Sequence, residues 1–301
     1  MAKRHNIGPG AGATRRLFGG RARDFAAVAA MAWGASACED NLTHPVAPDA
    51  YVGPDVVELT CVPNLDREIG AAELTPTTGV TVSYLVSPAG VTRAVDPVGV
   101  VDGSGRRVWD LTLPDGDPTI QVKATPIGAT WFAASFPSDA VAVPLDAAQS
   151  IDAVYRHDAD RQVFELLGLA SHEENPAEGK TLWQYEVPVV LYRFPLKDGA
   201  RWTSVGEVRN GLVRGLPYAG RDTYEVEVAG SGRLELPDAT FSQVLRVRNH
   251  LVSQPAVGAV SSRWQVSFLF ECFGEVARMT SASGEASADF TSAAEVRRFG
   301  L

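Results

Sequence analysis

Several features of enzymes and metal proteins are missing from this chain of 301 residues, which has only three cysteines and five histidines. No C-x-x-C or H-E-x-x-H spacing occurs, so the sequence predicts neither a metal site nor a thioredoxin-type redox centre. The G-x-S-x-G, P-loop and G-x-G-x-x-G patterns are also absent. We therefore expect no cofactor and no catalytic residue, and a hydrolase with an unrecognised site is the least favoured alternative.

Long hydrophobic runs are absent as well. Residues 25–37 carry no charge, but this run of 13 residues is shorter than the roughly 20 that cross a bilayer as a helix. A basic stretch precedes it and small residues close it, which is typical of a secretory leader. Residues 1–37 are therefore predicted to be a signal peptide. The segment 14–18 resembles a twin-arginine signal, but Gly19 and Gly20 depart from it, so both that route and the general secretory route stay open.

Positive charge is scarce beyond the leader. Residues 1–37 hold six cations and one anion, whereas the rest of the chain holds 21 cations and 35 anions. An acidic body repels phosphate groups, and no basic stripe with interleaved aromatic residues is present, so nucleic-acid binding is not expected.

The residues at the end of the leader also predict an anchor. Ala35-Ser36-Ala37-Cys38 resembles the bacterial lipobox, in which the cysteine after the cleavage site receives a lipid, although Ala35 stands where leucine is usual. The same small residues also permit an ordinary secretory cut. We favour lipidation of Cys38, with residues 38–54 as a polar, proline-broken flexible tether. The protein is then expected in the bacterial cell envelope, attached by its N-terminal lipid to the outer membrane.

The cysteine count agrees with export. If Cys38 is lipidated, Cys61 and Cys272 remain, and exported cysteines tend to pair. Both lie in apolar runs that read as strands, and a disulfide between them is predicted. Two unpaired core cysteines are the alternative.

Short apolar runs that alternate with turn signals dominate the body, which holds most of the 28 glycines and 19 prolines. Residues 161–170 are ambiguous between a strand and a short helix, and two Gly-Ser-Gly triplets, 103–105 and 230–232, read as hairpin turns. The spacing predicts an all-β protein with antiparallel sheets. The expected strands are 55–62, 79–86, 106–113, 119–125, 140–145, 183–196, 201–208, 221–230, 243–252, 263–273 and 275–282.

A polar stretch at residues 156–160 suggests a division of the body near residue 155. We expect a β-sandwich-like section over 55–155, followed by a curved β domain over 156–301. A single continuous sheet system is the alternative.

Residues 191–279 resemble a group of poorly characterised bacterial envelope lipoproteins. The matching residues are turn and packing residues: Phe194-Pro195-Leu196, Gly199, Trp202, Pro237, Phe241, Val244 to Val247, Gly274 and Val276. The resemblance implies a curved antiparallel sheet similar to the half-barrels that carry lipids or lipoproteins, and it implies no catalytic residues.

The tryptophans of the body are the remaining candidates for a binding site. Trp183, Trp202 and Trp264 could line a pocket for an apolar or sugar ligand, or simply belong to the core. The expected function is a non-enzymatic binding or scaffolding module of the envelope, with an envelope protein or a hydrophobic ligand as partner. A periplasmic carrier of a lipid or lipoprotein is the alternative.

Overall fold

The computed structural model describes residues 61–74, 76–113 and 116–301 of the chain. All of them belong to one compact unit, Glu58–Leu301. The predicted leader, the tether and Cys38 lie outside the described residues, as does most of the expected strand 55–62. Among the described residues, no helix is both long and apolar enough to cross a membrane.

The described part is built almost entirely of strands, as the sequence predicted, and its helical elements are single turns: α1 (Ala71–Leu74), η1 (Ile127–Ala129) and η2 (Ala133–Ser135). The strands are β1 (Thr81–Val86), β2 (Arg93–Ala94), β3 (Val100–Val101), β4 (Arg107–Asp110), β5 (Thr119–Lys123), β6 (Thr125–Pro126), β7 (Val141–Pro144), β8 (Ile151–Asp158), β9 (Val163–Ser171), β10 (Leu182–Arg193), β11 (Arg201–Val213), β12 (Leu216–Glu235), β13 (Thr240–Pro255), β14 (Ser261–Phe270), β15 (Gly274–Ser281) and β16 (Ser292–Phe299).

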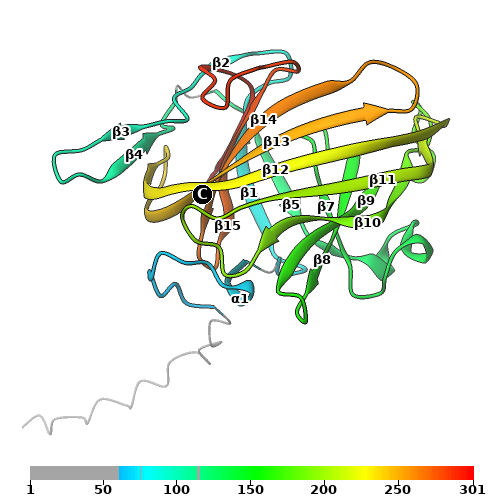
Figure 1. Cartoon of the computed structure of the whole chain (residues 1–301), viewed down its shortest axis with the longest axis horizontal. Coiled ribbons are helices and arrows are strands. Elements are labelled where there is room, and N and C mark those ends of the chain that lie inside the picture. The colour runs from blue at the N-terminus through cyan, green and yellow to red at the C-terminus, as the bar shows by residue number, and fades with distance from the viewer. Residues whose placement is uncertain (1–60, 75, 114–115) are drawn as a thin grey trace, which may run out of the picture. The chain divides into compact units, whose positions relative to one another are not determined.

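These strands form one curved sheet in the order β5-β1-β16-β15-β14-β13-β12-β11-β10-β9-β8-β7-β6 (Figure 1). All the pairings in this order are antiparallel, and a parallel contact joins β4 to the end of β12. The strands before residue 155 therefore belong to the same sheet as those after it. Residue 155 itself lies within β8, between β7 and β9.

The two edges of the sheet are formed by neighbouring pieces of chain, because only Ala124 separates β5 from β6. β5 pairs with β1 at one edge, and β6 pairs with β7 at the other. The segment 119–126 thus contains both edge strands, and the sheet curves until it nearly closes.

Side chains complete the closure where the backbone ladder is interrupted. Gln149 donates a hydrogen bond to the Gln121 carbonyl of β5 at 2.7 Å. Arg297 of β16 reaches the Leu145 carbonyl beyond β7 at 3.1 Å, and Arg278 of β15 reaches the same oxygen at 3.5 Å. These contacts tie β15 and β16 to the far edge.

Three hydrophobic clusters hold the sheet together. The largest lies inside the curve, where strands far apart in the sheet meet, as Ala153 of β8 and Leu269 of β14 do. Two further clusters lie on the outer face. The segment around Trp109 covers β12 to β16, and the segment around Phe132 covers β8 and β9. Because both faces of these strands are covered, they lack the strict alternation of a sheet with one wet face.

The structure decides three local predictions, of which one was wrong. The ambiguous segment 161–170 forms β9, a strand whose residues pair with β8 and β10. The triplet 230–232 is not a hairpin turn but lies at a bulge within β12, between Val228 and Ser231. The triplet 103–105 is the predicted turn, at the tip of the β3–β4 hairpin that projects from the sheet in Figure 1.

The Cys61–Cys272 disulfide is present, with Cα atoms 5.6 Å apart, as the sequence predicted. The expectation that both cysteines lie in strands was wrong. Cys61 is in an irregular segment, and Cys272 is in the tight turn between β14 and β15 with a φ of 67°. Its backbone N–H donates to the Glu73 carbonyl at 2.8 Å, so α1 is fastened to the same turn.

Candidate functional site

Two rows of polar side chains cross the outer face of β11 to β14. The strand register places Thr203 opposite Glu225, Glu225 opposite His250, and His250 opposite Trp264. Two residues further along, Arg201, Glu227 and Arg248 form a second row, pairing in the same way. Because side chains alternate between faces along a strand, both rows point away from the interior.

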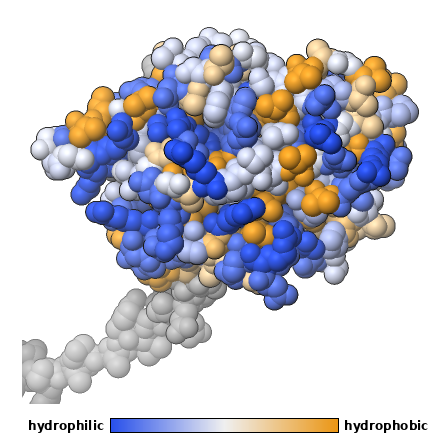
Figure 2. Space-filling view, viewed as in Figure 1, coloured by the Kyte–Doolittle hydropathy of each residue, from blue (hydrophilic) through white to orange (hydrophobic). Residues whose placement is uncertain are grey.

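A shallow hollow of about 610 Å³ lies over these rows. Figure 2 shows that hydrophilic side chains cover most of this side of the molecule, with hydrophobic ones scattered among them. The hollow is lined by Arg201, Trp202, Thr203, Glu225, Val226, Glu227, Arg248 and Trp264.

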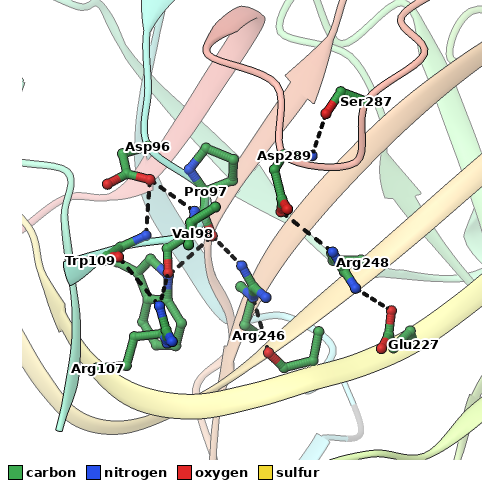
Figure 3. A network of polar contacts seen from close by, with 12 residues as sticks. Asp96, Pro97, Val98, Arg107, Trp109, Glu227, Arg246, Arg248, Ser287 and Asp289 are labelled. Atoms are coloured by element: carbon green, nitrogen blue, oxygen red, sulfur yellow. Dashed lines mark hydrogen bonds and ion pairs between the residues drawn. The ribbon is translucent and has the colours of Figure 1, made fainter. Parts of the chain in front are cut away.

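A chain of ion pairs runs along the second row, and Figure 3 shows its part from Glu227 through Arg248 to Asp289. Glu227 accepts hydrogen bonds from Arg201, whose Nε lies 3.0 Å away, and from Arg248. Arg248 also reaches Asp289 of the loop before β16, at 3.4 Å. Partial burial acts to raise the pKa of Glu227, but the hydrogen bonds from the two arginines outweigh it and hold this pKa below its ordinary value. Glu227 therefore stays ionised and keeps both guanidinium groups in place.

An aromatic stack lies beside the hollow, with Trp264 in its lining. The rings of His250 and Trp264 are stacked, with centroids 4.3 Å apart, and His250 Nδ1 lies 3.0 Å from Glu225 Oε2. The carboxylate fixes the imidazole, and the imidazole supports one face of the indole.

Two donors at the hollow lack an acceptor. Trp264 Nε1 and Arg248 Nε are buried, and neither has a hydrogen-bond partner among the described residues. Buried donors in folded proteins normally have an acceptor, supplied by the chain, by water or by a ligand.

The residues beside the hollow fix the outer segment that carries Trp109. Arg246 lies two residues before Arg248 on the same outer face of β13. It donates a hydrogen bond to the Pro97 carbonyl, and its guanidinium lies 5.8 Å from the centre of the Trp109 ring (Figure 3). Trp109 Nε1 donates to the Pro97 and Val98 carbonyls, both at 3.1 Å. Arg246 and Trp109 thus hold the segment over the sheet and leave the hollow next to it open.

The structure separates the three tryptophans that the sequence singled out. Trp264 lines the outer hollow. Trp202 borders it too, but its side chain is buried in the inner cluster and donates to the Val190 carbonyl at 3.0 Å. Trp183 stacks on Tyr218, with ring centroids 4.9 Å apart, and also packs against the inner cluster. The three do not converge on one pocket.

Sequence reasoning did not single out the charged partners at the hollow. In the sequence Glu225, Glu227 and Arg248 alternate with apolar residues, a pattern that gives each of their strands one polar face. The register that sets these residues beside Arg201 and Trp264 depends on pairing between strands, which no local pattern contains.

The interior of the curved sheet is filled by side chains, some of them polar. Tyr155 of β8 and Tyr192 of β10 face Glu275 and Arg278 of β15 across it, and burial raises the pKa of both tyrosines, to about 12 for Tyr155. Tyr84 donates to the Glu275 carbonyl at 2.9 Å, and burial raises its pKa to about 12. Tyr155 and Phe164 stack, with centroids 5.2 Å apart.

A second hollow, of about 770 Å³, lies beside α1 and is rich in acidic groups. Two of its carboxylates already have partners within the protein. Glu73 accepts a hydrogen bond from the Gly70 N–H at 2.6 Å, and Glu68 forms an ion pair with Lys197 at 2.6 Å. Within the described ranges no group of three or more His, Cys, Asp or Glu side chains could hold a metal ion.

Comparisons of the chain with protein-family models, with curated proteins and with solved structures found no match.

Proposed function

We propose that this protein is an exported bacterial envelope lipoprotein whose curved β body is a non-enzymatic binding or scaffolding module. The leader over residues 1–37 supports export, and the lipobox-like residues before Cys38 support lipid attachment there. The Cys61–Cys272 disulfide is in keeping with an oxidising compartment.

The large cluster of buried side chains inside the curved sheet is the observation that supports the binding or scaffolding role. A lipid carrier needs an apolar cavity inside its curved sheet, whereas a scaffold can fill that space with side chains. In this protein Ala153, Trp202, Val247 and Leu269 belong to one buried cluster there, and the tyrosines lie beside charged groups of β15. The polar hollow on the outer face is then the surface offered to a partner.

The anchor is tested by mass spectrometry of the protein purified from the membrane fraction of a bacterial host. The mature chain is expected to begin at Cys38 and to carry at least two acyl chains, since one chain gives only marginal membrane binding. A Cys38→Ser variant, which keeps the leader, should be recovered without lipid in the soluble fraction. A wild-type protein that is soluble and unmodified at Cys38 would refute the anchor.

The binding role is tested against the carrier role with the soluble Cys38→Ser protein. Organic extraction followed by lipid mass spectrometry should recover far less than one lipid per chain. Stoichiometric lipid in the extract would replace the scaffold with a carrier of hydrophobic ligands.

A further inference from the structure

The hollow on β11 to β14 combines three properties that together define a class of ligand. Its ionisable lining is balanced, because Arg201 and Arg248 face Glu225 and Glu227. A balanced lining gives a charged ligand no electrostatic advantage over a neutral one. The ligand that fits is therefore rich in hydrogen-bonding groups and carries little net charge.

The polar groups at the hollow are planar and held in position. Arg201 and Arg248 are fixed by the Glu227 carboxylate between them, and Glu225 is fixed by His250. Guanidinium groups offer several N–H donors, and carboxylates accept two or more hydrogen bonds. A hydroxyl group both donates and accepts, so adjacent hydroxyls can bridge such donor and acceptor pairs.

The indole supplies the apolar part of the site. Trp264 lines the hollow, and the stacked His250 ring prevents it from tilting away. A flat, apolar aromatic face beside precisely oriented polar groups suits a molecule with one C–H face and a rim of hydroxyls. The neighbouring guanidinium of Arg201, whose side chain is 72% exposed, offers N–H donors to oxygen acceptors beside this ring.

From these contacts we infer that the hollow is a carbohydrate-binding site for a neutral glycan chain, whose sugar rings lie against Trp264 and whose hydroxyls bridge Arg201, Glu225 and Arg248. The inference rests on the proposed binding function and names its ligand class. A glycan of the envelope would then hold the body at a fixed place while the lipid holds the tether.

The test is isothermal titration calorimetry of the soluble Cys38→Ser protein with short oligomers of N-acetylglucosamine and, separately, of glucose. Binding of either oligomer is expected. Arg201→Ala should weaken it about tenfold or more, because a charge-assisted hydrogen bond is lost. The Arg201 side chain is 72% exposed, so this substitution leaves the fold intact. Trp264→Phe should weaken binding as well and abolish any change in tryptophan fluorescence on adding sugar.

The matched control is Arg221→Ala. Arg221 also forms an ion pair between β11 and β12, with Glu207, and its side chain is 57% exposed, but it lies outside the hollow. This variant should bind as the parent does. Binding of neither oligomer, or binding that Arg201→Ala and Trp264→Phe leave unchanged, would overturn the inference. Such a result would leave the acylation of Cys38 and the low lipid content of the body unaffected, so the two proposals fail separately.

Discussion

At the scale of single residues, the sequence gives no sign of the role of Asp117, which is one of several aspartates in a turn-rich stretch. In the structure its side chain is fully buried and lies 2.7 Å from Arg298, which is 1% exposed. Arg298 also donates to the Leu111 carbonyl at 3.1 Å, and Arg93 pairs with the other carboxylate oxygen of Asp117. One carboxylate therefore forms ion pairs with two arginines of different strands.

Asp117→Asn should destabilise the protein strongly, because it leaves the Arg298 charge buried without its partner. Breaking a buried pair on one side typically costs about 3–5 kcal/mol. The measurement is the free energy of unfolding by urea denaturation, monitored by circular dichroism. Lys197→Ala, which removes an exposed pair with Glu68, should change the same free energy by less than about 1 kcal/mol. Equal effects of the two substitutions would contradict the structural role of Asp117.

At the scale of elements, the wall formed by β9 and β10 depends on a residue without a side chain. A Cβ at Gly168 of β9 would lie 2.1 Å from the Trp183 carbonyl oxygen and 3.0 Å from Phe136, a residue of the segment that covers the outer face. The first distance is to backbone and cannot be relieved by a rotamer change. β10 and the covering segment can therefore approach β9 only at a glycine.

Gly168→Ala should consequently lower the free energy of unfolding by about 1–3 kcal/mol or more, as overpacking in a dense interior does. Gly103→Ala is the control, because a Cβ at that position of the β3–β4 turn meets no atom within 4 Å. Thermal unfolding followed by circular dichroism compares the two. A Gly168→Ala protein as stable as the control would mean that β10 lies further from β9 than described.

Strands with a local sequence pattern could be predicted, whereas strands whose burial depends on residues far away in the sequence could not. Short apolar runs between turn signals located β11 to β15, because that pattern is contained within each strand and its flanking turns. β8 and β16 were missed. β8 ends in the polar residues Arg156 to Asp158, and β16 contains Arg297 and Arg298, whose burial depends on Leu145 and Asp117. The hollow was missed for the same reason, since its rows are assembled by pairing of four strands.

At the scale of the whole molecule, the interior tyrosines make stability depend on alkaline pH. Burial raises the pKa of Tyr84 and Tyr155 from 10.0 to about 12. Between these pH values the unfolded chain loses phenolic protons that the folded chain keeps, so the unfolded state gains stability as pH rises. The free energy of unfolding should fall by about 1.4 kcal/mol per pH unit for each such tyrosine.

Urea denaturation at several pH values from 9 to 12 (a window of roughly one to two units on either side of the ordinary tyrosine pKa) measures this slope. Tyr155→Phe should make the decline less steep, by the contribution of one tyrosine. A free energy of unfolding that stays constant above pH 10.0 would show that these phenols are open to solvent.

The disulfide has a mechanical consequence under the proposed anchoring through Cys38. Tension applied between the N-terminal side of Cys61 and the C-terminus passes from Cys61 through the sulfur atoms to Cys272 and then into residues 273–301, which carry β15 and β16. Residues 62–271 form a closed loop that lies off this load path. The strands β11 to β14, which carry the outer hollow, belong to that loop. A force that shears β15 or β16 is therefore not transmitted to these strands through the covalent chain.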